Sequence, residues 1–393
     1  MINSWRRLAV AAVITAPLFL ASACTTESGT ESSPSPTSSS APAEIAQATG
    51  VSEATQAALQ QQLATQLAQF DVPGAVVAVC VPGKDPYVLT EGVSDVAAGT
   101  PMTSDLVWPL RSVTKSFTVT LLLQLVDEGK MSLDDTIGTW VPGVPNGDQI
   151  TLRELANMTS GVPEYTTQAW IDDFLADENR NFTTSELISY ALAEPAQFPP
   201  GSLAVYVNTS TLLIGQAVSA VAGADFPAVL EQRILTPLGL TNTEYPLTAN
   251  DWSGPHPTGY QPNADGQLEA QVNNFTVFGP AGQMTSTVPD LCRWGSALGQ
   301  GELLTPATQQ ARIQGQPLAK GPDYDIYALG IGQVDGWWGH TGEGFGHTLL
   351  VMNNPETNVT AVVLMNESKA AEHVPTSYFR AVAGQLSTVG AQE

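Results

Sequence analysis

A serine and a lysine, Ser112 and Lys115, stand three residues apart at the head of the most apolar stretch of the chain. On a helix this spacing puts both side chains on one face, where they can meet. A serine hydroxyl is a weak nucleophile at its ordinary pKa and needs an adjacent base, and a neutral lysine can be that base. Burial and the positive end of the helix dipole would both lower the pKa of the lysine. The free N–H groups at the helix start could also help to hold an oxyanion.

The element that must position this pair is a helix running through Val119–Val126. The stretch is apolar on nearly every face, which predicts a helix buried in the centre of the molecule. Gly129 is typical of the residue that follows a helix end. The alternative interpretation is a serine N-cap followed by a solvated lysine. Of the five lysines in the chain only Lys115 has a serine three residues before it, yet this stretch alone leaves both interpretations open.

Length and charge limit the possible functions. At 393 residues the chain can bury a large core, as one large domain or as two interleaved ones. The net charge is −24 and no basic cluster occurs. Such a surface repels phosphate backbones, so we expect no nucleic-acid partner. The acidity is sufficient to keep an exported protein soluble.

The start of the chain has the pattern of an export signal. Arg6 and Arg7 form a charged region, and Leu8–Leu20 is an apolar run too short to span a bilayer. Small residues then lead to Cys24, which resembles a bacterial lipoprotein signal whose cysteine becomes the lipidated first residue. The alternative is an ordinary cleaved signal with an incidental cysteine. We therefore expect a signal peptide over 1–23 and a protein exported to the outer face of the bacterial cell membrane, held there by lipid or else secreted.

Residues 24–50 are rich in Ser, Thr, Pro and Ala and have almost no large apolar side chains. Such a segment cannot bury enough surface to order itself, so a disordered tether of roughly 30 Å r.m.s. is predicted. The folded domain would then cover 51–393. Cys80 and Cys292 could pair in an exported protein, but the sequence does not show whether they meet.

Strand patterns occur near both ends of the domain and helical patterns lie between them. Strands are expected over 74–81, 87–92, 326–334, 346–352 and 358–364. Besides the central helix, helices are expected over 52–69, 151–158, 184–193, 211–222, 228–235 and 375–386. This order predicts an α+β fold with one mostly antiparallel sheet built from both termini, flanking helices and a helical lobe. The active cleft should lie where the lobes meet, under the start of the central helix.

Several common hydrolase motifs are absent from the sequence. It contains no Gly-x-Ser-x-Gly elbow, no His-Glu-x-x-His zinc motif and no Walker loop. His256, His347 and His373 lack metal-ligand spacing and are predicted to be surface or core histidines. We therefore expect neither a metal nor a cofactor.

Two further stretches carry side chains that suit the same chemistry. Tyr206-Val207-Asn208 follows a Pro-Pro-Gly turn, and His340-Thr341-Gly342 lies at the edge between two strand patterns. Taken singly, each is more typical of a packed tyrosine with a turn asparagine, or of a tight turn. Together with Ser112-Val113-Thr114-Lys115, and in this order, they resemble the three motifs of the serine β-lactamase and penicillin-binding-protein superfamily. The resemblance is strongest to the low-molecular-mass D-alanyl-D-alanine carboxypeptidases, whose motifs are Ser-Val-Thr-Lys, Tyr-Ser-Asn and His-Thr-Gly.

The resemblance covers about Val51 to the C-terminus and implies the β-lactamase/transpeptidase-like fold, in agreement with the sheet and helical lobe expected above. Further stretches that resemble family landmarks are Leu122–Lys130, Leu133–Asp135, Ser160–Val162, Pro237–Thr241 and Ala281–Met284.

The resemblance also implies roles for the motif residues. Ser112 would attack a carbonyl and hold the acyl group. Lys115 and Tyr206 would move the proton, and which of them is the base in each step stays open. A tyrosine needs a cation beside it to ionise near neutral pH, and Lys115 could supply one. Asn208 would hold the amide oxygen of the substrate.

The third motif would bind substrate through His340, Thr341 and Gly342. His340 stands where β-lactamases usually carry a lysine and would tie its strand to the cleft by hydrogen bonds, so we expect β-lactams to be hydrolysed weakly. The oxyanion hole would consist of the backbone N–H groups of Ser112 and Glu343.

Two departures from the family pattern affect specificity. Val207 replaces the central serine of the second motif, which removes a hydroxyl from the proton-relay region. Relatives that cleave D-alanine hold its carboxylate with an arginine on the strand before the third motif, but residues 327–338 contain no Arg or Lys. Glu343 adds a negative charge nearby, which disfavours the binding of a substrate carboxylate.

These features predict an exported serine hydrolase that is acylated and deacylated at Ser112. The first hypothesis is a D-alanyl-D-alanine carboxypeptidase acting on cell-wall peptides, and the alternative is a β-lactamase-related esterase or amidase. A hypothesis of another class is a wall-binding lipoprotein without turnover. The expected partners are a small peptide or ester, β-lactams as covalent inhibitors, and a membrane contacted only through the lipid.

Overall fold

The computed structural model describes residues 42–368 and 372–390. The predicted signal peptide, Cys24 and most of the predicted tether lie outside these residues. At the end of the tether the structure differs from the expectation, because Pro42–Thr49 forms a helix, α1. Ile45 and Thr49 bury part of this helix against the domain. The Asp85 backbone N–H also donates to the Ala48 carbonyl at 3.1 Å, so side-chain burial and a backbone hydrogen bond both hold this short helix.

One eight-stranded sheet joins the two ends of the chain. Its order is β3-β2-β1-β12-β11-β10-β9-β8. β1 (Gly74–Cys80) pairs antiparallel with β12 (Thr360–Met365), so the first and last long strands lie side by side in the centre. β11 (His347–Asn353) is buried along its whole length, as expected for a strand covered on both faces. The predicted antiparallel sheet built from both termini is confirmed.

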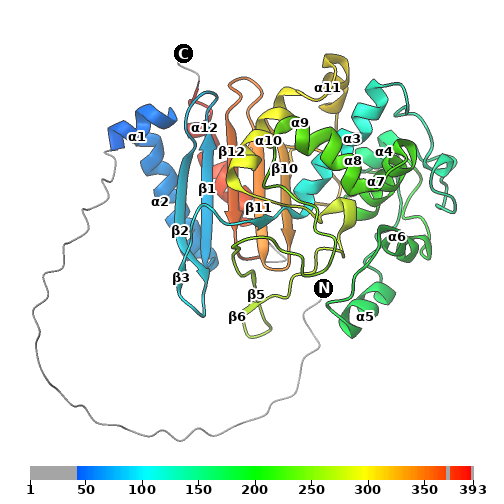
Figure 1. Cartoon of the computed structure of the whole chain (residues 1–393), viewed down its shortest axis with the longest axis horizontal. Helices are drawn as coiled ribbons and strands as arrows, with labels where there is room; N and C mark the ends of the chain where they lie inside the picture. The colour runs from blue at the N-terminus through cyan, green and yellow to red at the C-terminus, as the bar shows by residue number, and fades with distance from the viewer. Residues whose placement is uncertain (1–41, 369–371, 391–393) are drawn as a thin grey trace, which may run out of the picture.

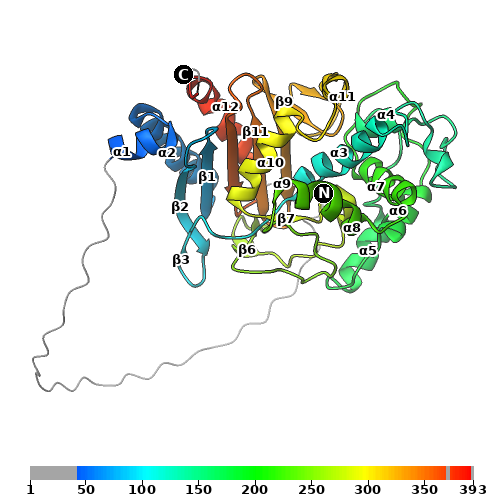
Figure 2. The same ribbon diagram turned by 45° about the horizontal axis from the view of Figure 1, so that its top comes forward.

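Helices cover the two faces of the sheet. α2 (Glu53–Phe70) and α12 (Val374–Leu386) pack together on one side, and α10 (Val288–Gln300) packs on the other (Figures 1 and 2). A disulfide between Cys80 of β1 and Cys292 of α10 links the sheet to this last helix.

The other strands of the sheet are β2 (Tyr87–Asp95), β3 (Thr100–Pro101), β8 (Ile326–Tyr327), β9 (Gly332–Val334) and β10 (Trp337–Gly344). Two small ladders pair β4 (Trp108–Pro109) with β7 (Thr285–Ser286) and β5 (Tyr260–Pro262) with β6 (Leu268–Ala270). The expected strand over 326–334 is thus two short strands and a turn. The third motif lies inside β10 and not between two strands. Gly339 and Gly342 suggest a turn in the sequence, but in the structure they let β10 pack closely against neighbouring backbone.

The helical lobe is an insert between β4 and β5. Its elements are η1 (Arg111–Val113), α3 (Thr114–Asp127), η2 (Ile137–Thr139), α4 (Leu152–Ala156), α5 (Gln168–Ala176), α6 (Thr184–Leu192), α7 (Asn208–Ala222), α8 (Phe226–Leu230), the π-helical turn η3 (Glu231–Leu235) and α9 (Thr236–Leu238). η4 (Gly279–Ala281) and α11 (Pro306–Arg312) complete the described helices. Within the described part of the chain, no single helix is long and apolar enough to cross a membrane. One sharply bent pair of helices, residues 208–222 with 226–238, has the length and composition of a span when the two are taken together.

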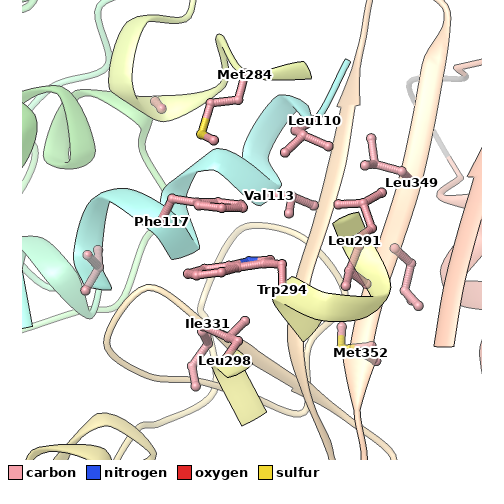
Figure 3. Packing of buried hydrophobic residues seen from close by; sticks show 14 of the residues in the cluster. Leu110, Val113, Phe117, Met284, Leu291, Trp294, Leu298, Ile331, Leu349 and Met352 are labelled. Atoms are coloured by element: carbon pink, nitrogen blue, oxygen red, sulfur yellow. The ribbon is translucent and has the colours of Figure 1, made fainter. Parts of the chain in front are cut away.

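α3 is the buried central helix that the sequence predicts, and it runs between the sheet and the rest of the lobe (Figure 2). The ring of Phe117 stacks on that of Trp294 from α10 with centroids 3.7 Å apart (Figure 3). The Trp294 indole N–H donates to Ser116 Oγ at 3.0 Å. Leu110 N–H donates to Met284 O at 2.7 Å just before the helix. These contacts fix the turn that carries Ser112.

Candidate active site

Ser112 and Lys115 meet as the sequence predicts. Ser112 lies in the 3-10 turn η1 and Lys115 in the first turn of α3. The Lys115 amine nitrogen is 3.0 Å from Ser112 Oγ. Lys115 is fully buried, whereas Ser112 keeps part of its surface exposed, so a substrate can reach the hydroxyl.

Two further hydrogen bonds of the Lys115 amine indicate which of its protonation states fits the site. Its amine donates to Asn208 Oδ1 at 2.7 Å and to the Ala281 carbonyl at 2.9 Å. A neutral amine has two N–H bonds and one lone pair, so two donors to these oxygens leave the lone pair for the Ser112 hydroxyl. Burial lowers the pKa of Lys115 to about 7, against the opposing charge of Glu164. The amine can therefore be neutral at physiological pH and act as a base.

Glu164 is a site residue that sequence reasoning missed. Its Oε2 accepts from the Asn208 backbone N–H at 2.7 Å and from Asn208 Nδ2 at 3.2 Å. This contact turns the Asn208 carbonyl oxygen toward Lys115. Burial raises the pKa of Glu164, and the Lys115 charge partly offsets that rise. The only signal for it in the sequence is its place two residues after the Ser160–Val162 landmark.

Tyr206 lies in the extended segment before α7, with its ring centroid 5.0 Å from the Lys115 amine. Its hydroxyl is buried and has no hydrogen-bond partner of standard geometry among the described residues. Burial raises the pKa of Tyr206 well above its ordinary value, and the nearby Tyr327 adds to the rise, although the Ser112 hydroxyl opposes it. The phenol therefore stays protonated at neutral pH. Desolvation thus opposes the ionisation that the resemblance leads us to expect beside Lys115.

His340 fastens the third motif to its neighbours. Its ring nitrogens lie 3.1 Å from the hydroxyl of Tyr327 and 3.2 Å from that of Tyr324. The Thr341 backbone N–H donates to the Tyr324 hydroxyl at 2.7 Å. Burial, together with the Lys115 charge, lowers the pKa of His340 to about 3, so the ring is neutral. His340 therefore ties the strand to the cleft as predicted and supplies no positive charge.

Gly342 lets β10 approach the nucleophile turn. A Cβ at this position would lie 2.5 Å from the Leu110 carbonyl oxygen and 3.0 Å from the Arg111 Cβ. A side chain would therefore push the strand away. The close contact places the backbone of Glu343, the next residue, beside the turn that carries Ser112.

Arg111, directly before the nucleophile, has a backbone φ of 46°, which is uncommon for a residue other than glycine. Its guanidinium donates from Nε to the Gly344 carbonyl at 3.0 Å and from Nη2 to Asn273. The guanidinium carbon lies 5.0 Å from the ring centroid of Phe278 and 5.6 Å from that of Phe345. This buried cation thus links the nucleophile turn to the end of β10.

Glu343 is the acidic residue that directly follows Gly342 on β10. Part of its side chain is exposed, yet the protein around it raises the pKa of the carboxyl to about 7 by desolvation. A cation placed beside this carboxylate would favour its ionised form.

The assembled groups suit acyl transfer. A partly exposed hydroxyl faces a buried amine that can be neutral, and a protonated phenol and a close-packed strand lie beside them. Among the described residues no cluster of His, Cys, Asp or Glu has the composition and geometry to hold a metal ion.

Comparison with known proteins points to one family. The family model described as Beta-lactamase matches residues 59–385. Penicillin-binding protein 4 of Amycolatopsis lactamdurans is 27% identical over 350 residues, which cover 82% of this chain and 87% of that protein. The crystal structure of a D-stereospecific amidohydrolase from Streptomyces sp. superposes with a TM-score of 0.73 at 30% identity, over 82% of this chain and 98% of that one.

A second solved structure has the same fold. The D-amino acid amidase from Ochrobactrum anthropi SV3, complexed with L-phenylalanine amide, superposes with a TM-score of 0.76 at 24% identity, over 85% of this chain and 99% of that one.

Proposed function

The chain belongs to the β-lactamase family of serine hydrolases, and from this premise we propose that it is an amidase acting on D-amino-acid amides or short peptides with a free amino group. The observation that carries the proposal is the carboxylate of Glu343, one residue beyond the glycine that packs on the nucleophile turn. A carboxylate there would pair with a substrate ammonium and repel a substrate carboxylate.

In the acylation step the neutral Lys115 amine takes the proton of Ser112 as its oxygen attacks the amide carbonyl. The backbone N–H groups of Ser112 and Glu343 hold the oxyanion. The protonated Tyr206 hydroxyl gives a proton to the leaving amine and recovers one from the Lys115 ammonium. The C–N bond then breaks and leaves an ester at Ser112.

In deacylation a water molecule takes the place of Ser112 as the nucleophile, and Lys115 is again the base. Water loses a proton to the Lys115 amine and attacks the ester, and the proton returns to Ser112 as the acid leaves. Burial favours Lys115 over Tyr206 as the base in both steps, because it lowers the pKa of the amine to about 7 and raises that of the phenol.

Three partly exposed phenylalanines suggest what the acyl side chain is. The ring of Phe345 lies 5.7 Å from that of Phe174 and 5.5 Å from that of Phe278. Phe345 also has a backbone φ of 44°, an uncommon conformation that tends to persist where function requires it. Two of these rings, those of Phe278 and Phe345, also contact the guanidinium of Arg111, the residue directly before Ser112, so they favour an aromatic or large apolar side chain in the substrate.

A second candidate function is the D-alanyl-D-alanine carboxypeptidase activity implied by the motifs, which the likeness to a penicillin-binding protein favours. It needs a cation for the substrate carboxylate. The guanidinium next to Ser112, that of Arg111, is buried and donates to Gly344 and Asn273. The neutral His340 supplies no charge either. We therefore rank the amidase first.

We also propose that the protein works outside the cytoplasm as a lipoprotein anchored through Cys24. The Cys80–Cys292 disulfide supports this placement, because disulfides persist in oxidising compartments. Replacing Cys24 by serine should release the protein from the membrane fraction and abolish incorporation of a fatty-acid probe. Unchanged membrane association of that variant would contradict the anchor.

The substrate class is tested with three compounds: D-phenylalanine p-nitroanilide, its N-acetyl derivative and an acyl-D-Ala-D-Ala peptide. We expect kcat/KM for the free amine to exceed that for the N-acetyl compound by about 10-fold or more, a difference of about 1.4 kcal/mol. Glu343→Gln should remove most of this preference, whereas Glu302→Gln, in the Arg293 ion pair, should keep it. Faster release of D-alanine from the peptide would favour the carboxypeptidase instead.

A further inference from the structure

His373 contacts the peptide group that joins Gly342 to Glu343. Its Nε2 lies 3.1 Å from the Gly342 carbonyl oxygen. The N–H of the same peptide group belongs to Glu343 and is the second donor of the oxyanion hole proposed above. His373 therefore lies one peptide bond away from the developing charge, on the far side from the substrate.

The hydrogen bonds of the ring define its tautomer. His373 is the N-cap of α12, and its Nδ1 accepts from the Thr376 backbone N–H at 3.3 Å. The Gly342 carbonyl oxygen can only accept, so in the neutral ring the proton is on Nε2, and the Thr376 hydroxyl, 2.8 Å from Nδ1, donates to that nitrogen. Although part of the side chain is exposed, burial lowers the pKa of His373 to about 4. At neutral pH the ring thus donates from Nε2 to the Gly342 carbonyl.

A donor to a peptide carbonyl affects the N–H at the other end of the same amide. Resonance couples the two groups, and a hydrogen bond to the oxygen polarises the N–H and strengthens the bond that it makes. The contact also fixes the plane of the peptide, and a preorganised donor loses less energy to reorientation during the reaction.

We propose that His373 is a positioning residue for the oxyanion hole, holding and polarising the Gly342–Glu343 peptide so that its N–H is directed at the acyl oxygen. The inference rests on the proposed acyl-enzyme at Ser112. It gives a role to a histidine that the sequence places only as a surface or core residue.

The side chain is suited to this double contact. Helix N-caps are usually Ser, Thr, Asp or Asn, whose short side chains bond only to their own helix. The imidazole is longer, so it caps α12 with one nitrogen and reaches β10 with the other. α12 is held independently, since the Tyr378 hydroxyl donates to the Leu59 carbonyl at 3.1 Å. Replacing His373 should therefore leave the helix in place.

The test compares two variants and a control. His373→Asn keeps a cap acceptor but is too short to reach the Gly342 carbonyl, and His373→Gln can reach it. His256→Asn removes an exposed histidine that stacks on Trp252. Each protein is acylated with benzylpenicillin labelled with ¹³C at the β-lactam carbonyl. The acylation rate and the infrared stretch of the acyl carbonyl are then measured, with melting temperature as the check on folding.

We expect His373→Asn to acylate about 10-fold more slowly, less than the 10²–10³-fold cost of deleting an oxyanion donor outright. Its acyl carbonyl stretch should move to higher wavenumber, because the carbonyl is less polarised. His373→Gln should recover most of both properties, and His256→Asn should match the wild type. An unchanged carbonyl band in His373→Asn would overturn this inference alone. A wild-type protein that forms no acyl-enzyme at Ser112 would overturn the proposed function and the inference with it.

Discussion

The Lys115 amine lies 3.0 Å from the Ser112 hydroxyl, with Asn208 and Ala281 accepting its two other hydrogen bonds. A fully protonated ammonium would donate in all three directions and leave no lone pair for the serine proton. The arrangement therefore works as a base only when the amine is neutral. This requirement determines how activity should depend on pH.

Activity should fall on the acid side as Lys115 becomes protonated. Burial lowers its pKa to about 7, so kcat/KM should decrease as the pH drops through about 7 and should level off above it. Lys115→Ala should lose roughly 10²–10⁴-fold in kcat/KM, the usual contribution of a general base. A pH–rate profile with a substrate that does not titrate in this range measures the midpoint. An acid limb near the ordinary pKa of lysine would contradict the assignment.

Glu164→Gln should shift this acid limb to lower pH. The ionised carboxylate stabilises the Lys115 ammonium and so raises the pKa of the amine. Glutamine removes that charge but keeps an acceptor for Asn208. The matched control is Glu186→Gln, a carboxylate in the capping box of α6. A midpoint that stays in place in both variants would mean that Glu164 is neutral in the active enzyme.

Tyr206→Phe should separate stability from activity. The Tyr206 hydroxyl is buried without a hydrogen-bond partner of standard geometry among the described residues, so its removal leaves no group unsatisfied. We expect an unchanged or slightly higher melting temperature, together with a 10²–10⁴-fold loss of kcat on amides. Activated esters should lose less, because their leaving groups need no proton. A large loss of stability would show that the hydroxyl has a structural role.

Removal of the disulfide should weaken the fold without affecting the chemistry. Cys80 and Cys292 are 212 residues apart, and closing a loop of this length stabilises the folded state by about 5 kcal/mol in the chain-entropy model. The double serine variant should melt roughly 5–10 °C lower and keep its kcat/KM at 25 °C. Calorimetry and a standard assay measure the two effects. Equal melting temperatures with and without reductant would indicate that the bond does not form.

The sequence predicts the site better where the signal is local. Ser112 and Lys115 are three residues apart, and helix geometry alone brings them together. Tyr206 and His340 come from distant segments, and only the family resemblance predicts that they belong to one site with Ser112. The strands at both ends are predicted because their β patterns are strong, whereas β10 contains three glycines, Gly339, Gly342 and Gly344, and its sequence therefore resembles a turn.

Glu164, Arg111 and His373 could not be predicted. Each acts through a backbone group or an amide of another segment, so its role depends on tertiary packing that no spacing in the sequence reveals. The helix α1 is a similar case, since Ile45 and Thr49 gain their burial only from the folded domain.

The central claim is that Ser112 becomes acylated, and the mass of the full-length protein after incubation with benzylpenicillin tests it most directly. We predict an increase equal to one penicilloyl group, located by digestion in the peptide that contains Ser112, and no increase in Ser112→Ala. An adduct on any other residue would contradict the account, and a protein that neither benzylpenicillin nor an uncharged fluorophosphonate modifies at Ser112 would favour a binding protein without turnover.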